Sequence, residues 1–428
     1  MNNKRKLYLF LLLLPIIDVL TSVTEKFDLN LPSLGIIIKS VFLGIMILYL
    51  IISSTSKYKK MSLYYLVAIF LYIILFFITK INYLNLFLFV TELKYMIKIL
   101  FYPISLITMI CYFDDKKFSK EELSSTLLKS FFIYLLFIII PFITKTGFNS
   151  YMDGSYGSSG WFYAANEMAI ILIVLFPFSY MLLKKSIVFV IIPIISALLI
   201  STLGTKVSMI GLYIVSLMIF MFSLFYRKNN KVDKKLIISC LLILISVVIV
   251  FNNSKILKNL DNSIKVQERQ NEIDRELLQI PDGDKTKDSF VYILMNKYGK
   301  AILSDRDIYF NYTYKIYNDN FDINTLLFGV GYSNNKKINN IAITKLIEID
   351  FFDILFHSGL IMSLIVFLPF VYFIVKLFKS KKFNINIVFY TLMIALIFSI
   401  SCLSGHTFGA PAVSIYLSLY MIFAFGEI

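Results

Sequence analysis

Residues 351–375 read FFDILFHSGLIMSLIVFLPFVYFIV, an apolar run with one carboxylate and one histidine near its start. A helix needs about 20 predominantly apolar residues to cross a bilayer, so this run predicts a transmembrane helix. The chain of 428 residues is 58% hydrophobic and only 16% charged, with a mean hydropathy of +0.77. A water-soluble fold leaves too much surface in water to hide that much apolar area. The sequence therefore predicts a membrane protein.

Similar runs recur along nearly the whole chain, and they predict an all-α polytopic membrane protein with about 12 transmembrane helices. The predicted spans are residues 7–22, 34–53, 63–79, 97–113, 127–143, 162–183, 187–202, 207–226, 236–250, 351–375, 387–402 and 411–425.

The cationic residues predict the orientation of these spans, because lysine and arginine in short loops mark the cytoplasmic side. Clusters lie at residues 4–6, 57–60, 116–120, 184–185, 227–235 and 379–382. Counted from a cytoplasmic N-terminus, each cluster follows an even number of predicted crossings, so both termini are predicted to be cytoplasmic. The net charge of +15 is then spread over loops at one face of the lipid bilayer, which argues against a nucleic-acid partner.

One segment of about 100 residues interrupts this pattern and is far longer than an ordinary connection. It divides the chain into an N-terminal transmembrane bundle of about nine helices (residues 1–250), a large extracytoplasmic loop (251–350) and about three C-terminal transmembrane helices (351–428). Within the loop, residues 262–278 predict an amphipathic helix. The Tyr-rich stretch 305–317 suits a membrane surface, where aromatic rings are favoured.

Acidic residues lead into the span that follows the large loop. At helical spacing, Asp350, Asp353 and His357 share one face, and Glu348 lies just before it. These acids could simply complement the positive end of a helix dipole. Alternatively, they could provide a general base at an outward-facing cavity.

Four cations are candidates for binding an anionic group. Arg306 in the large loop could clamp a phosphate with its planar fork, or could form a solvated ion pair. Lys206 follows a short outer turn where a lipid phosphate would lie, although snorkelling also explains it. Lys94 and Lys98 are one turn apart on one span; they could hold an anionic head group or pair with Glu92 at the helix end.

Further polar residues lie inside or at the rim of spans, where burying them is costly: Asp18, Asn166 and Glu167. Asn166 and Glu167, together with His357, are predicted to contribute to substrate binding. No metal-binding spacing of His, Cys or Asp is present, and the three cysteines all fall within predicted spans. The sequence predicts neither a metal nor another cofactor.

The order of these features resembles the family of O-antigen ligases and Wzy-type polysaccharide polymerases, best over residues 166–360. The resemblance rests on Asn166-Glu167, Lys206, Ser304-Asp305-Arg306, Gly329-Val330-Gly331 and Ser358-Gly359-Leu360. Two positions depart from the family pattern. Glu348-Ile349 stands where a histidine followed by asparagine is common, and Lys206 stands where an arginine is usual.

The resemblance implies a glycosyltransferase at the outer face of the bacterial cytoplasmic membrane. Its donor would be a polyprenyl-diphosphate-linked glycan and its acceptor another glycan, making it a surface polysaccharide polymerase or a ligase. It also leaves room for contacts with other membrane proteins of polysaccharide assembly. Glu348 would be the general base, with Asp350 or Asp353 orienting it or the acceptor.

In this interpretation, Arg306 and Lys206 would stabilise charge on the diphosphate. A flippase or transporter for the same lipid-linked glycan is the alternative, and it would also explain charges inside the membrane. Transporters commonly carry internal repeats and broken helices at the midplane, and the sequence shows neither.

Overall fold

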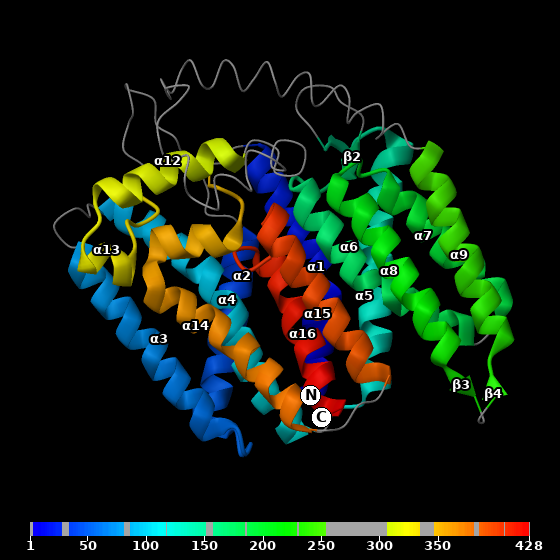
Figure 1. Ribbon diagram of the computed structural model, residues 1–428, viewed down its shortest axis with the longest axis horizontal. Helices are drawn as coiled ribbons and strands as arrows, with labels where there is room; N and C mark the ends of the chain where they lie inside the picture. Colours follow the sequence, from blue (N-terminus) through cyan, green and yellow to red (C-terminus); the bar gives the residue numbers. More distant parts are fainter. Residues whose placement is uncertain are drawn as a thin grey trace.

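The computed structural model describes residues 3–27, 34–80, 86–116, 118–150, 157–184, 186–228, 231–253, 306–333, 346–380, 385–405 and 407–427. They form a bundle of long helices (Figure 1), with both ends of the chain at one end of the bundle, which we call the terminal end. The opposite end, where α12 (Arg306–Asp319) and α13 (Ile323–Phe328) lie, is the distal end.

Every predicted span coincides with helical structure. The helices of the bundle are α1 (Asn3–Lys26), α2 (Leu34–Leu48) with its π-helical extension η1 (Tyr49–Ser53), α3 (Lys59–Lys80), α4 (Leu86–Lys116), α5 (Lys120–Thr144), α6 (Ala165–Ser179), the 3₁₀-helices η2 (Tyr180–Lys184) and η3 (Ile187–Val190), α7 (Ile191–Ser201), α8 (Lys206–Phe225), α9 (Lys234–Asn253), α14 (Asp350–Ser380), α15 (Ile385–Ser404) and α16 (Pro411–Glu427).

Within the described residues, ten helices are long and apolar enough to cross a membrane, and Val188–Ser201 and Pro411–Gly426 are shorter apolar helices. The prediction of a helical polytopic membrane protein is confirmed. The total of twelve crossings and the cytoplasmic placement of the termini stay predictions.

Polar residues set where the helices begin. The Ser119 hydroxyl accepts a hydrogen bond from the Glu122 N–H at the start of α5, and the Thr205 hydroxyl accepts one from the Ser208 N–H at the start of α8. These caps satisfy amide groups that the first helical turn leaves without a partner. The short turns between apolar runs are thereby fixed at definite residues.

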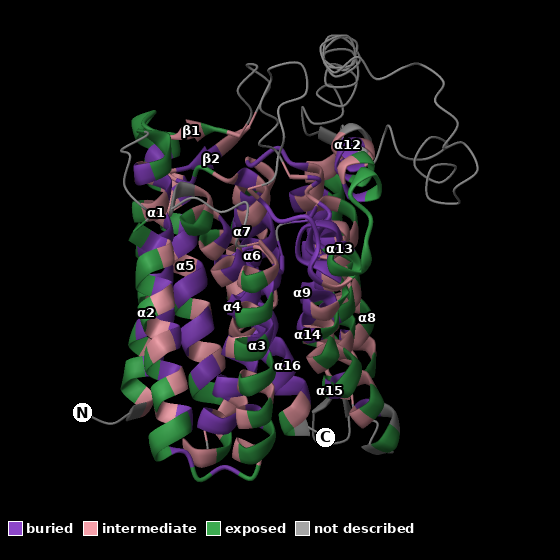
Figure 2. Ribbon diagram, turned by 90° about the vertical axis from the view of Figure 1, so that its left-hand side faces the viewer, coloured by how far each residue is buried: buried purple, intermediate pink, exposed green. Residues whose placement is uncertain are grey.

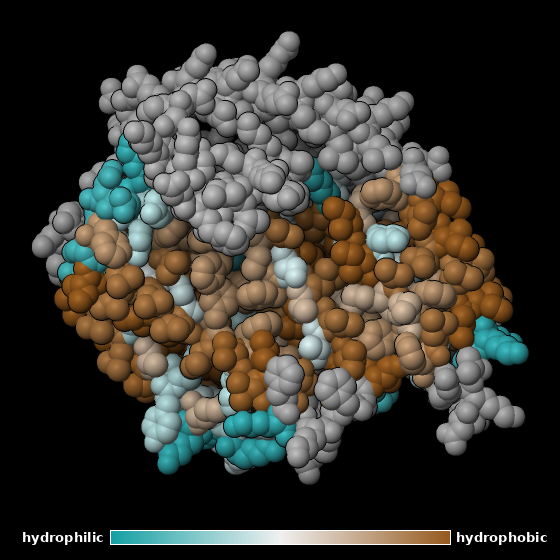
Figure 3. All heavy atoms as spheres, in the orientation of Figure 1, coloured by the Kyte–Doolittle hydropathy of each residue, from teal (hydrophilic) through white to brown (hydrophobic). Residues whose placement is uncertain are grey.

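A broad band of hydrophobic side chains surrounds the bundle, and hydrophilic residues gather towards its two ends (Figure 3). Large apolar residues in this band are widely exposed, including Ile52 and Val188, each 74% exposed, and Ile143, 73% exposed. Such a surface would be unfavourable in water, but it suits contact with lipid chains.

The centre of the bundle is formed by α6 and α16, whose residues are buried on nearly all sides (Figure 2). The Tyr420 hydroxyl of α16 donates to the Val174 carbonyl of α6 at 2.8 Å, which satisfies a polar group in the apolar interior. Two small antiparallel pairs complete the fold: β1 (Phe148–Asn149) with β2 (Ser158–Gly160), and β3 (Arg227–Lys228) with β4 (Lys231–Val232).

Helix α14 differs from the continuous span that its sequence predicts, because it is broken at Gly359. The backbone there has φ 77° and ψ −177°, a conformation essentially confined to glycine. Figure 1 shows a first piece lying across the bundle and a second piece descending to the terminal end. The 21 residues from 360 to 380 are long enough to cross a bilayer by themselves.

The turn after α13 fills this break and satisfies the carbonyl groups that the break releases. The N–H groups of Val330 and Gly331 donate to the carbonyls of Phe356 and His357 at 2.9 and 2.8 Å. The Tyr72 hydroxyl donates to the Ser358 carbonyl at 2.7 Å. Irregular backbone is tolerated inside a membrane protein when protein groups provide such partners.

Of the predicted large loop, the structure describes residues 251–253, which end α9, residues 306–333, and residues 346–350, the last of which begins α14. The Tyr-rich stretch predicted for the membrane surface forms α12, which packs on the first piece of α14 through Phe310, Tyr317 and Phe356. The amphipathic helix predicted at residues 262–278 and the motif residues Ser304 and Asp305 lie outside the described residues.

Candidate functional site

The first group of candidate residues meets where α12 begins. The Nη2 atom of Arg306 lies 3.0 Å from Glu348 Oε2, and its Nε donates to the Glu348 carbonyl at 3.0 Å. The same Nη2 donates to the Ser404 carbonyl at the end of α15, at 3.2 Å. One guanidinium therefore joins α12, the residues before α14 and the end of α15, a task suited to its rigid set of five donors.

Glu348 is held in a backbone conformation that is uncommon for its residue type. Its φ is 61°, in the left-handed region. Asp353 stabilises this conformation, since its two carboxylate oxygens accept hydrogen bonds from the N–H groups of Ile347 and Glu348 at 3.0 and 2.9 Å. Gly405 packs so closely on Glu348 that a Cβ atom there would lie 2.3 Å from the Glu348 carbonyl oxygen. The surroundings thus fix the position of this glutamate.

Asp350 binds a different element from Asp353. Its Oδ2 accepts hydrogen bonds from the Ser401 hydroxyl at 2.8 Å and from the N–H groups of Thr407 and Phe408 at 2.8 and 2.9 Å. This buried carboxylate fixes the turn at residues 405–410, which links α15 to α16. Asp350, Asp353 and His357 were predicted to share one helix face. In the structure, Asp350 contacts the segment between α15 and α16, whereas Asp353 contacts the backbone just before α14.

His357 is enclosed by the protein. Its Nδ1 lies 2.9 Å from the Asp353 carbonyl and 3.8 Å from the Asp353 carboxylate. Its ring stacks on Tyr332 at 4.4 Å, and Tyr332 stacks in turn on Tyr95 at 4.6 Å. Burial raises the pKa of Tyr332 well above its ordinary value, so this tyrosine stays neutral.

Exposure separates Glu348 from the other candidates of this group. The Glu348 side chain is 24% exposed, whereas those of Arg306, Asp353 and His357 are 8%, 9% and 2% exposed. Asp350 is also buried. Glu348 is therefore the carboxylate of this group that a substrate can reach most directly.

A buried glutamate anchors the turn that fills the break in α14. Glu92 Oε1 accepts hydrogen bonds from the Ser333 N–H and hydroxyl, each at 2.6 Å. Its Oε2 is buried and has no hydrogen-bond partner among the described residues. Lys80 binds the same turn, donating to the Gly329 carbonyl at 2.5 Å. Helices α3 and α4 thereby hold the position of His357.

The second group of candidates lines a cavity of about 80 Å³ between α1, α2, α4, α6 and α16 at the distal end. Two residues predicted from the sequence, Lys98 and Glu167, line it together with Glu25 and Lys39. Lys94 lies close enough to Glu25 and Lys98 for their charges to act on it. This cavity thus gathers both cations and carboxylates.

A buried ion pair forms the base of this cavity. Lys39 Nζ lies 2.5 Å from Asp18 Oδ1, and the Tyr134 hydroxyl donates to Asp18 Oδ2 at 2.5 Å. Both charged side chains are less than a tenth exposed. The two opposite charges therefore stabilise each other in the apolar interior, where a buried charge without a partner would be costly.

The turn at residues 405–410 connects the two groups. Thr407 and Phe408 bind Asp350 on one side, and Gly409 lines the cavity that contains Lys98. The Arg306–Glu348 pair and the cavity are therefore neighbours across one short segment. Within the described residues, no group of three His, Cys, Asp or Glu side chains gathers closely enough to hold a metal ion.

Two predicted residues occupy more peripheral positions. Asn166 is half-buried on the first turn of α6, beside Glu167. Lys206 begins α8 at the distal end, next to β2, whose Ser158 N–H donates to the Thr202 carbonyl at 2.9 Å. The structure brings Lys206 to the same end of the bundle as Arg306 but places it on the α8 side (Figure 1).

Lys39 and Glu25 were not among the candidate residues predicted from the sequence. Lys39 had a signal, because it is a cation within the apolar run of α2, and charges in such runs are costly unless they have a function or a partner. Glu25, at the end of its apolar run, carried no such signal. It becomes a candidate only because packing brings it beside Lys98 and Glu167.

Comparison with known proteins agrees with the resemblance drawn from the sequence. Residues 2–425 match the family model described as O-antigen ligase like membrane protein. No curated protein and no solved structure matches the chain. Because the family match spans nearly the whole chain, the protein belongs to the O-antigen ligase like family, membrane enzymes that transfer glycans in surface glycan assembly.

Proposed function

We propose that this protein transfers a glycan from a polyprenyl-diphosphate carrier onto an acceptor glycan at the distal end of the bundle. The observation that carries the proposal is the Arg306–Glu348 pair, a reachable carboxylate held beside a charged cavity. The cationic loops support a cytoplasmic terminal end, so the distal end would face outside, as a surface polysaccharide polymerase or ligase requires.

The proposed reaction is a direct displacement at the anomeric carbon of the donor sugar. The acceptor hydroxyl forms the new C–O bond as the bond to the diphosphate breaks, and its proton passes to Glu348. The polyprenyl diphosphate leaves with the bonding electrons, and the anomeric configuration inverts. Ion pairing favours the ionised form of a carboxylate, which is the form that a general base needs.

Arg306 is the proposed site of charge stabilisation. Its guanidinium is largely buried beside Glu348, and an arginine in a partly dry site stabilises developing negative charge more strongly than one in water. A diphosphate oxygen near this fork would lie close to the proposed base. Lys206 is proposed as a second cation towards the carrier head group, acting as a point charge.

The charged cavity is proposed to hold the glycan or the carrier head group. Lys94 and Lys98 offer ammonium donors, and Glu167 offers acceptors for sugar hydroxyls. Asn166 would extend this surface from the first turn of α6. Asp350 and Asp353 are proposed as positioning residues, because their carboxylates hold the turn at 405–410 and the backbone of Glu348.

Reconstitution tests the proposal. The purified full chain in liposomes would receive a polyprenyl-diphosphate-linked oligosaccharide from its own pathway, without nucleotide or added metal, and products would be read by mass spectrometry. We expect products extended by whole repeats for a polymerase, or an acceptor conjugate for a ligase once the acceptor is supplied. Unchanged donor together with its movement across the bilayer would contradict glycan transfer and identify a flippase.

A further inference from the structure

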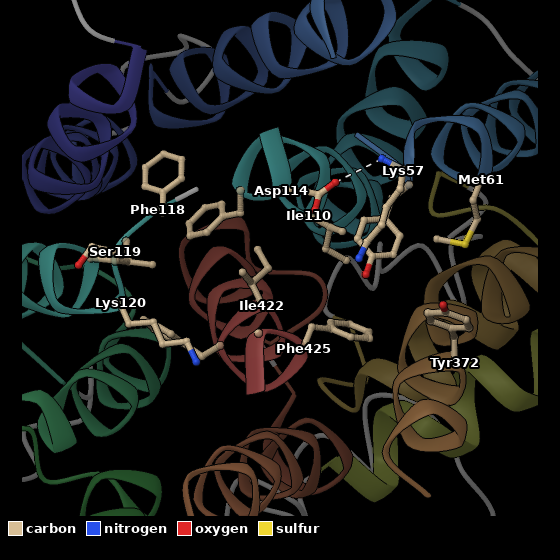
Figure 4. A pocket seen from close by; sticks show the side chains of 15 residues that line it. Lys57, Met61, Ile110, Asp114, Phe118, Ser119, Lys120, Tyr372, Ile422 and Phe425 are labelled. Atoms are coloured by element: carbon tan, nitrogen blue, oxygen red, sulfur yellow. Dashed lines mark hydrogen bonds between the residues drawn. The ribbon is translucent and has the colours of Figure 1, made fainter. Parts of the chain in front are cut away.

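A second cavity lies at the terminal end of the bundle, away from the Arg306–Glu348 pair. Its volume is about 410 Å³, within the range of roughly 300–1,000 Å³ typical of sites for small organic ligands. It is surrounded by α3, α4, α5, α14 and α16 (Figure 4). Aromatic rings form much of its wall: Tyr58, Phe113, Phe118, Tyr372 and Phe425.

Lysine side chains surround this aromatic wall. Lys57 and Lys120 line the cavity. The ammonium group of Lys57 lies 5.0 Å from the centre of the Tyr58 ring, and that of Lys376 lies 4.7 Å from the centre of the Phe425 ring. Cation–π contacts of this kind hold ammonium groups over ring faces. The rings that form the wall therefore also place positive charge at its edge.

Asp114 is the single acid among the residues that line the cavity. Its Oδ2 already accepts hydrogen bonds from the Ser56 hydroxyl at 2.7 Å and from the Lys57 N–H at 3.2 Å, the second of which is drawn in Figure 4. Backbone and hydroxyl donors thus hold this carboxylate, while the described ammonium contacts of Lys57 and Lys376 are with the Tyr58 and Phe425 rings.

The mouth of the cavity meets the surface that faces lipid. Met61 is 44% exposed and Tyr372 is 42% exposed, and both belong to helices of the outer band. A ligand could thus enter sideways from a bilayer leaflet. An apolar wall edged with cations matches an amphiphile that has an anionic head and an apolar chain.

We propose that this cavity binds an anionic phospholipid of the leaflet at the terminal end. Its phosphate would lie between the ammonium groups of Lys57 and Lys376, and part of an acyl chain would lie along Phe113 and Phe425. The cytoplasmic leaflet carries anionic lipids that attract lysine clusters, which agrees with the predicted orientation. The site is separate from the proposed reaction centre and does not depend on glycan transfer.

Native mass spectrometry of the full chain in detergent tests the proposal, using short-chain phosphatidylglycerol, phosphatidylcholine of the same chain length, and inorganic phosphate as probes. We expect phosphatidylglycerol to bind more tightly than phosphatidylcholine. The double variant K57Q/K376Q should weaken its binding by about 30-fold, since each lysine near an anionic lipid contributes roughly fivefold. The matched control K234Q/K235Q removes two exposed lysines at the start of α9 and should bind as the wild type does.

A second variant tests the acyl-chain contact. Met61→Trp would narrow the exposed mouth, so lengthening the chains of phosphatidylglycerol should strengthen binding to the wild type but not to this variant. All variants should keep the thermal midpoint of the unliganded wild type, which separates lost binding from lost folding. Equal binding of the two lipids, equal losses in both lysine variants, or full competition by inorganic phosphate would overturn the lipid assignment.

Discussion

At the scale of single residues, the site depends on one carboxylate that stays reachable while its neighbours are buried. Arg306 and Asp353 both bind Glu348, one through the side chain and carbonyl and the other through the backbone N–H. This arrangement orients a candidate base without closing it off from solvent. The sequence placed Glu348 and Asp353 in one candidate group and Arg306 in another, and packing across 42 positions brings Arg306 and Glu348 into contact.

The Arg306 fork gives the first prediction. Arg306→Lys keeps the charge but loses the planar donors that bind Glu348 and the Ser404 carbonyl at once. Turnover in reconstituted liposomes should fall roughly 100-fold, a loss typical of removing one preorganised donor. Lys315→Arg on the exposed face of α12 is the control and should leave the rate unchanged. An Arg306→Lys enzyme at full rate would eliminate the proposed clamp.

Asp353 gives a prediction that combines stability with activity. Asp353→Asn would turn an amide donor towards one of the two N–H groups that the carboxylate now satisfies. A buried donor without an acceptor costs about 1–3 kcal/mol, so thermal unfolding should shift to lower temperature and turnover should fall. The exposed Asp319→Asn, at the end of α12, should change neither. Unaltered stability and rate in Asp353→Asn would exclude the positioning role.

At the scale of elements, the break in α14 determines how the distal end is built. Gly359 packs on the backbone of residues 327–328, and Gly329 packs on the backbone of residues 357–358. A Cβ atom added to either glycine would lie within 2.5 Å of these backbone atoms. The sequence indicated a continuous helix because a glycine within an apolar run is common in membrane spans. Only the partner turn at residues 329–331 shows that the helix must end there.

Replacing Gly359 tests this element. Gly359→Ala combines an unfavourable backbone conformation, worth about 1–3 kcal/mol, with a methyl group 2.4 Å from the Leu327 carbonyl carbon. Unfolding in detergent should occur at a clearly lower temperature. Gly44→Ala in α2, where nothing lies within 4 Å of the added methyl, should be neutral or slightly stabilising. Equal midpoints for the two variants would mean that the break is not structurally required.

At the scale of the whole molecule, the sequence predicts most of the helices but little of the site. Each apolar run forms a helix because membrane crossing is specified locally, by length and composition. The cavity that brings Lys39, Glu25 and Glu167 together depends on the packing of α1, α2 and α6, for which no local pattern exists. The family resemblance came from the order of the motifs, and the family match confirms it.

The orientation of the bundle is a prediction at this same scale. Single cysteines introduced at Lys235, at the terminal end, and at Asn320, at the distal end, should react differently with a membrane-impermeant maleimide on intact cells. The distal position should be labelled at once, and the terminal position only after the membrane is opened. The opposite pattern would place the proposed reaction centre in the cytoplasm, contrary to a role in surface glycan assembly.

The most direct test of glycan transfer at the Arg306–Glu348 pair is the turnover rate of Glu348→Gln on a lipid-linked glycan in liposomes. The amide keeps the size of the side chain but cannot accept the acceptor proton, so the rate should fall by a factor of about 100 to 10,000. Glu121→Gln, at the terminal end, should turn over as the wild type does. A Glu348→Gln enzyme that turns over at the wild-type rate would show that the reaction centre lies elsewhere.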